Sequence, residues 1–183
     1  NQINQIENLV NEFSDFARMP KPIFKKNDII KILDENLKLL TEIDKSITID
    51  FKKIYEKIIF NCDKEQIGRV FFNLIKNSIE SIQQKSEKST DFKKKISIEI
   101  LSNHDHIKVT FIDNGIGLGD IKGDLKNIMN PYFTTKKNGT GLGLSIVNKI
   151  VNDHNGVLNF YPIPDGAKVE INFNIDVSRN FNS

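Results

Sequence analysis

The 183-residue chain has no tryptophan, one cysteine and five prolines. Because Cys62 is the single cysteine, an intrachain disulfide is excluded, and a reduced, cytoplasmic setting is favoured. No apolar run approaches the roughly 20 residues of a membrane-spanning helix, and no signal peptide is expected at the first residues. The net charge of +2, spread over the whole length, argues against a dedicated nucleic-acid surface.

Apolar residues make up 38% of the chain and fall in periodic runs, so a globular body is expected. Helical spacing predicts helices over residues 1–18, 28–43, 64–84 and 145–153. Alternation predicts strands over residues 47–51, 57–60, 96–100, 107–111, 157–161 and 167–175. Together these elements predict an α/β two-layer sandwich, in which about three helices cover one face of a mixed, mostly antiparallel five-stranded sheet.

The first predicted helix carries a coiled-coil-like stripe at alternating steps of three and four residues: Ile3, Ile6, Val10, Phe13 and Ala17. Such a stripe is too apolar to face water. A partner helix from outside this sequence is one interpretation, and packing against its own domain is the other. Met19-Pro-Lys-Pro22 ends the helix, because proline cannot continue it.

The segment Asn138-Gly-Thr-Gly-Leu-Gly-Leu144 has glycine at every second position and leads into the last predicted helix. Helix starts present unpaired N–H groups and a partial positive charge, so a phosphate chain is a natural ligand there. The backbone of Gly139, Gly141 and Gly143 can supply donors to such phosphates. A glycine-rich run alone is weak support, because ordinary turns have the same composition.

Asn73 and Asn77 lie four residues apart on the predicted helix 64–84, so they share one of its faces. An amide oxygen is a suitable ligand for Mg²⁺, which also takes water and phosphate oxygens. The alternative is two surface asparagines in an asparagine-rich chain. Glu80 follows three residues later and lies either near the same metal or in solvent.

Asp113-Asn-Gly-Ile-Gly117 comes directly after the predicted strand that ends near Ile112. A carboxylate fixed at a strand end can accept a hydrogen bond from the exocyclic amine of adenine. Gly115 and Gly117 allow the backbone to pass close to a flat base. A plain turn after a strand would have a similar composition.

Between residues 119 and 140 the apolar pattern is lost, and we expect a mobile lid. It contains Pro131-Tyr-Phe-Thr-Thr-Lys136, in which Phe133 could pin the lid to the body. Lys136 and Lys137 could reach triphosphate oxygens. The alternative is a tethered aromatic ring beside two exposed lysines.

These four clusters, in this order, resemble the ATP-binding domain of sensor histidine kinases, in the superfamily that also holds gyrase, a heat-shock chaperone and MutL. They look like its asparagine box, first glycine box, phenylalanine box and second glycine box, and the resemblance covers residues 27–176. Residues 8–22 look like the second dimerisation helix and exit linker of the NtrY-type nitrogen-regulation kinases. Neither a Gly-x-x-x-x-Gly-Lys-Ser/Thr loop nor a Gly-x-Gly-x-x-Gly dinucleotide fingerprint is present.

The resemblance implies a Bergerat-type fold that binds ATP with Mg²⁺, with Asn73 and Asn77 as catalytic residues. Asn77 would hold the metal, Asn73 would lie by the phosphates, and Asp113 would read the adenine amine. Other residues implied at the nucleotide are Lys76, Gly115, Gly117, Phe133, Thr135, Lys136, Lys137, Gly139, Thr140, Gly141, Leu142, Gly143 and Leu144. Many sensor kinases carry a basic residue where this chain has Glu80, so Lys76, Arg69 or a lid lysine is expected to replace it.

The implied reaction transfers the γ-phosphoryl group of ATP to a histidine on a dimerisation domain, for onward transfer to an aspartate of a response-regulator receiver domain. We expect residues 1–22 to belong to that dimerisation domain of a homodimeric, membrane-bound parent and residues 23–183 to form the catalytic domain. The acceptor histidine is expected before residue 1, so this fragment should not phosphorylate itself. A self-contained ATPase, a serine kinase and a degenerate dimerisation module are the alternatives.

Overall fold

The computed structural model describes Ser14 and residues 19–89, 91–118, 125–134, 136 and 139–175. The expected helix over residues 1–18 lies outside the described residues except for Ser14. Thr135, Lys137, Asn138 and residues 119–124 of the predicted lid also lie outside them. Among the described residues, no helix has both the length and the apolar character needed to cross a membrane.

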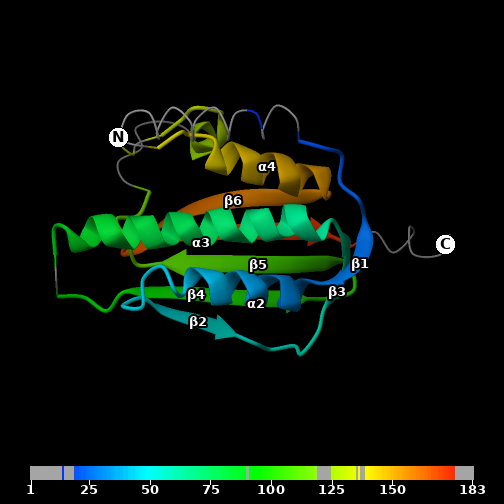
Figure 1. Cartoon of the computed structure of the whole chain (residues 1–183), viewed down its shortest axis with the longest axis horizontal. Coiled ribbons are helices and arrows are strands. Elements are labelled where there is room, and N and C mark those ends of the chain that lie inside the picture. Colours follow the sequence, from blue (N-terminus) through cyan, green and yellow to red (C-terminus); the bar gives the residue numbers. More distant parts are fainter. Residues whose placement is uncertain are drawn as a thin grey trace.

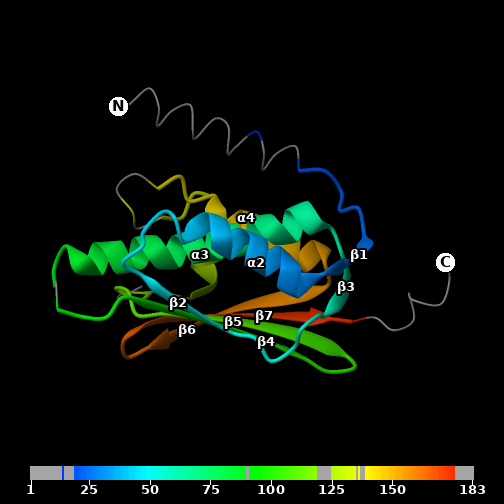
Figure 2. The same ribbon diagram turned by 60° about the horizontal axis from the view of Figure 1, so that its bottom comes forward.

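The fold is a two-layer sandwich, as predicted: three helices cover one face of a five-stranded sheet (Figures 1 and 2). The strands lie in the order β2-β4-β5-β7-β6, and only the β2–β4 pair is parallel. Their bounds are β2 Thr48–Lys52, β4 Lys95–Ser102, β5 His106–Asp113, β6 Gly156–Ile163 and β7 Gly166–Asn174. The helices are α2 Ile29–Leu40, α3 Lys64–Ser86 and α4 Gly143–Asp153.

A second, two-stranded sheet lies outside the main one, and the sequence did not predict it. Strand β1 (Lys25–Asp28) pairs antiparallel with β3 (Ile59–Cys62). The short strand predicted over residues 57–60 thus exists, two residues later. Strand β1 has no apolar alternation of its own, and it is a strand because its backbone bonds to β3 (Figure 1).

Aspartates begin two of the three helices that cover the sheet. Asp28 accepts a hydrogen bond from the Ile30 N–H at 3.1 Å, at the start of α2. Asp63 accepts from the N–H groups of Glu65 and Gln66 at the start of α3. Such caps satisfy helix N–H groups that have no partner within the helix. The start of α4 has no such side-chain cap.

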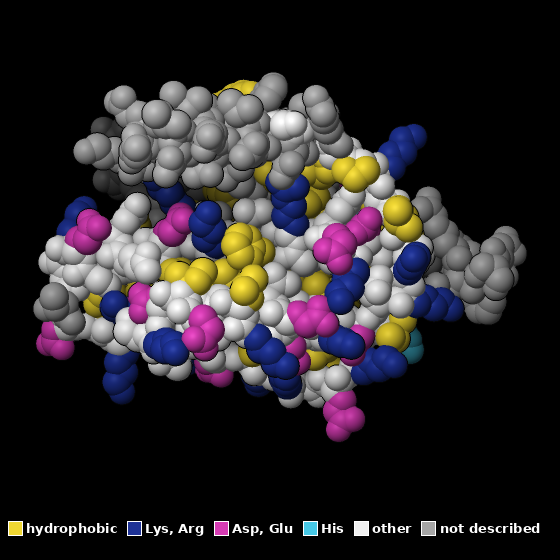
Figure 3. Space-filling model, in the orientation of Figure 1, with side chains coloured by type: hydrophobic (Ala, Val, Ile, Leu, Met, Phe, Trp, Pro, Cys, Tyr) yellow, Lys and Arg dark blue, Asp and Glu magenta, His cyan; other side chains and the backbone are white. Residues whose placement is uncertain are grey.

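The core lies between the sheet and the helices, and phenylalanines of several elements meet in it. Phe71 of α3 lies 6.0 Å from Phe111 of β5, and Phe60 of β3 lies 4.9 Å from Phe173 of β7, measured between ring centroids. All four are buried. This packing fixes α3 over the centre of the sheet. On the solvent side of the helical layer, basic and acidic side chains are interspersed (Figure 3).

The expected linker contacts the start of α3. Met19 packs against the core, and the Gln66 side chain donates to the Pro20 carbonyl at 3.0 Å. The Ile23 N–H donates to the Asp63 carboxylate at 2.9 Å. In the predicted lid, residues Leu125–Met129 form a short 3₁₀ helix, η1, where no regular structure was expected.

Candidate nucleotide site

Helix α3 carries both predicted asparagines four residues apart, and Asn73 faces α4. The Asn73 side chain donates to the Arg69 carbonyl at 3.0 Å, which fixes its orientation. Its Oδ1 lies 3.6 Å from the place that a Cβ on Gly143 would occupy. Asn73 therefore faces the first residue of α4, so two clusters that are 70 residues apart in sequence meet.

Asp113 is a buried carboxylate at the end of β5, only 5% exposed. Its Oδ1 accepts from the Gly115 N–H at 3.0 Å and from the Ser81 hydroxyl at 3.4 Å. Its Oδ2 accepts from the Ser78 hydroxyl at 3.2 Å. Burial raises the pKa of Asp113, and these hydrogen bonds oppose the rise without cancelling it. The result is an oriented acceptor that cannot rotate without losing bonds.

The first glycine cluster is packed against protein backbone. A Cβ on Gly115 would lie 2.2 Å from the Ser81 hydroxyl and 2.6 Å from the Ser81 carbonyl carbon. The neighbouring Ile116 N–H donates to the Ser81 carbonyl at 3.3 Å. Glycine is thus required at position 115 by the approach of α3 itself. The predicted contact of this backbone with an adenine base remains a prediction.

The second glycine cluster is joined to the predicted lid. Gly141 has φ +71°, and a Cβ there would lie 2.4 Å from the Tyr132 carbonyl carbon. The Tyr132 N–H donates to the Gly141 carbonyl at 3.0 Å. A Cβ on Gly139 would lie 2.4 Å from the Thr134 hydroxyl oxygen. Phe133, between them, remains 38% exposed, so its ring is not part of the core.

Helix α4 begins without a side-chain cap, unlike α2 and α3. Leu142 occupies the N-cap position, is fully buried and offers no side-chain acceptor. The Thr140 hydroxyl accepts from the Leu142 N–H at 3.4 Å, which precedes the helix. Where α2 and α3 begin on a carboxylate, α4 begins on a buried apolar side chain. Its first N–H groups and positive helix end therefore fit an anionic ligand.

Lys136, a lysine of the predicted lid, contacts the second of the two asparagines. Its ammonium group donates to Asn77 Oδ1 at 2.8 Å and forms an ion pair with Glu80. Lys76 lies farther away, with its ammonium nitrogen 3.9 Å from the Glu80 carboxylate. Of the basic residues proposed to compensate for Glu80, Lys136 contacts both Glu80 and the predicted metal ligand.

Several residues with a role in this region were not predicted from the sequence. Ser78 and Ser81 hold Asp113, and Ser78 could have been noticed as a polar residue within the buried stripe of α3. Lys85 donates to the Asn114 carbonyl at 2.9 Å and pairs with Asp165. Gly166 follows Asp165, and a Cβ there would lie 1.8 Å from the Asp113 carbonyl oxygen.

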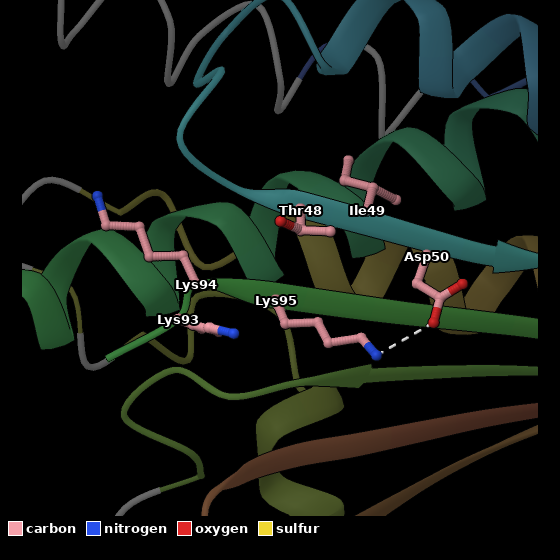
Figure 4. A pocket seen from close by; sticks show the side chains of 6 residues that line it. All are labelled: Thr48, Ile49, Asp50, Lys93, Lys94 and Lys95. Atoms are coloured by element: carbon pink, nitrogen blue, oxygen red, sulfur yellow. Dashed lines mark ion pairs between the residues drawn. The ribbon is translucent and has the colours of Figure 1, made fainter. Parts of the chain in front are cut away.

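A surface hollow of about 380 Å³ lies beside the edge strand β2 (Figure 4). Thr48, Ile49 and Asp50 line one side of it, and Lys93–Lys95 line the other. Lys95 pairs with Asp50 at 3.1 Å, and Lys94 donates to the Ser46 hydroxyl at 3.0 Å. Since it contains no residue of the four clusters, this hollow is not the predicted site.

The arrangement has the groups that Mg-ATP needs: a fixed acceptor for an amine, an amide oxygen for a hard cation and an uncapped helix start for phosphates. Residues 62–178 match the family described as histidine kinase-, DNA gyrase B- and HSP90-like ATPase. The chain belongs to this family, and within it the chain is an ATP-binding catalytic domain of the histidine kinase type.

A putative NtrY-like sensor histidine kinase of Rickettsia bellii is 33% identical over 94% of this chain and 27% of its own length. The nitrogen regulation protein NtrY of Azorhizobium caulinodans is 30% identical over 90% of this chain and 21% of its own length. The chain thus spans about a quarter of these relatives. The crystallised catalytic domain of histidine kinase ThkA is 26% identical, with a TM-score of 0.71 over 83% of this chain and 97% of that domain.

Proposed function

We propose that residues 23–183 bind Mg-ATP and transfer its γ-phosphoryl group to a histidine of a dimerisation domain, to which residues 1–22 belong. The observation that carries this proposal is the convergence on α3 of Asp113 from β5 and the uncapped start of α4. Catalysis of phosphoryl transfer depends chiefly on positioning and charge stabilisation, and this site offers both.

Each group has a separate part in the proposal. Asp113 accepts the adenine amine, and its two serine partners hold the carboxylate in place. The N–H groups of Gly141, Leu142, Gly143 and Leu144 bind phosphate oxygens. Asn77 holds Mg²⁺, which when bound neutralises phosphate charge. Asn73, which faces the start of α4, carries an amide, and an amide cannot take a proton from water. Transfer to another group is therefore favoured over hydrolysis.

The acceptor histidine is expected outside this sequence. His154 cannot accept a phosphoryl group in the fold, because both of its ring nitrogens are engaged. Its Nδ1–H donates to the Ile150 carbonyl at 2.8 Å, and its Nε2 accepts from the Asp63 N–H at 3.1 Å. The side chain is also buried, at 2% exposure. His104 and His106 are exposed, but they lie at the β4–β5 turn, at the opposite end of β5 from Asp113. We therefore propose that the fragment does not phosphorylate itself.

The proposed partners follow from the relatives. ThkA has been crystallised in complex with the response regulator protein TrrA, and that chain shares the fold with a TM-score of 0.76 at 22% identity. By analogy, we propose that the phosphoryl group passes to an aspartate of a receiver domain. We also propose that the whole protein is a homodimer anchored in the cell membrane.

Binding is tested by calorimetry with Mg²⁺ and adenylyl imidodiphosphate. The wild-type fragment should bind, and Asp113→Asn should lose at least tenfold in affinity because it presents an amide to the base amine. Asp50→Asn is the matched control, since this exposed aspartate lies on β2 and pairs with Lys95. Equal loss in both variants, or no binding by the wild type, would contradict the proposal.

Transfer is tested with γ-labelled ATP. Label should appear on an added NtrY-type dimerisation domain that carries its acceptor histidine, and none should remain on the fragment alone. Label that stays on the fragment in a form that is both alkali-stable and acid-labile, as phosphohistidine is, would contradict the assignment of the acceptor. Label on neither protein, with nucleotide binding intact, would contradict the kinase reaction.

A further inference from the structure

Two cations compete for the Asn77 side-chain oxygen. Under the proposed function it is a ligand of Mg²⁺, and in the structure it accepts a hydrogen bond from the Lys136 ammonium at 2.8 Å. A divalent cation and an ammonium group that share one oxygen repel each other at short range. Lys136 therefore has to leave Asn77 when the metal binds there.

Glu80 holds Lys136 in that place. The Glu80 carboxylate forms an ion pair with the Lys136 ammonium, and it lies one helical turn beyond Asn77 on the same side of α3. The side chains of Lys136 and Glu80 are 32% and 34% exposed, so the pair is only partly screened by water. The second lysine near this carboxylate, Lys76, is 3.9 Å away.

The backbone N–H and carbonyl of Lys136 each make a hydrogen bond. Its N–H donates to the Thr134 hydroxyl at 3.1 Å, and its carbonyl accepts from the Gly139 N–H at 3.2 Å. The long lysine side chain can change partners while this backbone stays in place. Phosphate oxygens at the start of α4 would offer the ammonium a second, stronger set of anionic acceptors.

We propose that Glu80 is a positioning residue that holds the Lys136 ammonium group on the metal-ligand oxygen of Asn77. Mg-nucleotide must displace this ammonium group from Asn77, and the phosphate oxygens of the nucleotide then bind it. This inference rests on the proposed function and names a regulation of that same site. The Glu80–Lys136 ion pair opposes metal binding at Asn77 until triphosphate oxygens bind the lysine ammonium group.

The test measures binding of adenylyl imidodiphosphate by the 183-residue chain, with Mg²⁺ titrated at fixed nucleotide. Glu80→Gln removes the charge that holds Lys136, so nucleotide affinity should rise about two- to fivefold, the range of a partly exposed ion pair. The Mg²⁺ concentration for half-saturation should fall by a similar factor. Glu80→Asp keeps the charge and loses the reach, so it should show the same direction.

The control separates positioning from simple repulsion between Glu80 and the phosphates. In the Lys136→Met background, Glu80→Gln should give a clearly smaller gain than in wild type, because no ammonium is left to release. Glu35→Gln removes a comparable ion pair, with Lys64 at 2.9 Å, and should leave nucleotide affinity unchanged. Thermal unfolding checks that each variant is folded.

Three outcomes overturn the inference: no gain in Glu80→Gln, loss of affinity in Glu80→Asp, or a gain that is as large without Lys136 as with it. The last outcome would mean that Glu80 acts only by repelling phosphate. Failure of the proposed function looks different, because then the wild type and all variants would show no Mg-dependent binding of the nucleotide.

Discussion

Replacing Gly115 by alanine tests whether the first glycine cluster is required by protein packing. The added Cβ would lie 2.2 Å from the Ser81 hydroxyl oxygen and 2.6 Å from the Ser81 carbonyl carbon. The hydroxyl can rotate away, but it then loses its bond to Asp113. The carbonyl carbon belongs to the backbone of α3 and cannot rotate, so the loop or the helix must shift.

Such overpacking costs about 1–3 kcal/mol. For a chain of this size each kcal/mol lowers Tm by about 2–4 °C, so Gly115→Ala should lower Tm by about 2–12 °C. Gly68→Ala is the matched control, because Gly68 lies within α3 and a Cβ there would be 3.5 Å from its nearest neighbour, the Asn36 side chain. Alanine in a helix interior is favoured over glycine by about 0.5–1 kcal/mol, so Tm should rise by about 1–4 °C.

Both variants can be followed by circular dichroism during heating and in urea, with nucleotide affinity measured at a temperature where both are folded. If Gly115→Ala unfolds like the wild type and loses only nucleotide affinity, glycine is needed there for the ligand, and the packing argument is refuted. If both variants shift in the same direction, the contacts at these glycines do not determine stability.

Three further predictions concern buried titratable groups. Because burial raises the pKa of Asp113 in the fold, its ionised form opposes folding, so Asp113→Asn should unfold at an equal or higher temperature at pH 7.5 and lose this advantage below pH ~4. Burial lowers the pKa of His154 from 6.5, so its contribution to the free energy of unfolding should be complete above pH 6.5 and should decrease as the pH drops below that value. His154→Gln should abolish this decrease. Burial raises the pKa of Cys62 to about 12, so Ellman's reagent at pH 8 should label it only at the rate of unfolding; rapid labelling of folded protein would contradict its burial.

The main sheet and α3 could be predicted because their periodicity is local. Ile96, Ile98 and Ile100 alternate along one strand and all point to the core. The polar residues of α3 were harder to interpret, since Ser78 and Ser81 have a role only through Asp113, which is more than 30 residues away. Strand β1 shows the same limit, because its partner β3 supplies the reason for its conformation.

The candidate site also has a part that the sequence predicts and a part that depends on the fold. The order of the four clusters predicted that they meet, and the structure brings Asn73 to Gly143 and Gly141 to Tyr132. The partner of Lys136 could not be predicted, because a lysine reaches several groups and the choice depends on where the chain around it lies. The sequence raised the question of what balances Glu80, and only the fold provides an answer.

A helix that starts on Leu142 instead of an aspartate is left energetically incomplete, and the missing part is one that a phosphate can supply. Under the proposed function, nucleotide then acts as a structural component as well as a substrate. A ligand that binds only the folded chain raises its stability by about 2.7 kcal/mol at a hundredfold excess over Kd. The resistance of this domain to heat and proteolysis would thus follow the ATP supply of the cell.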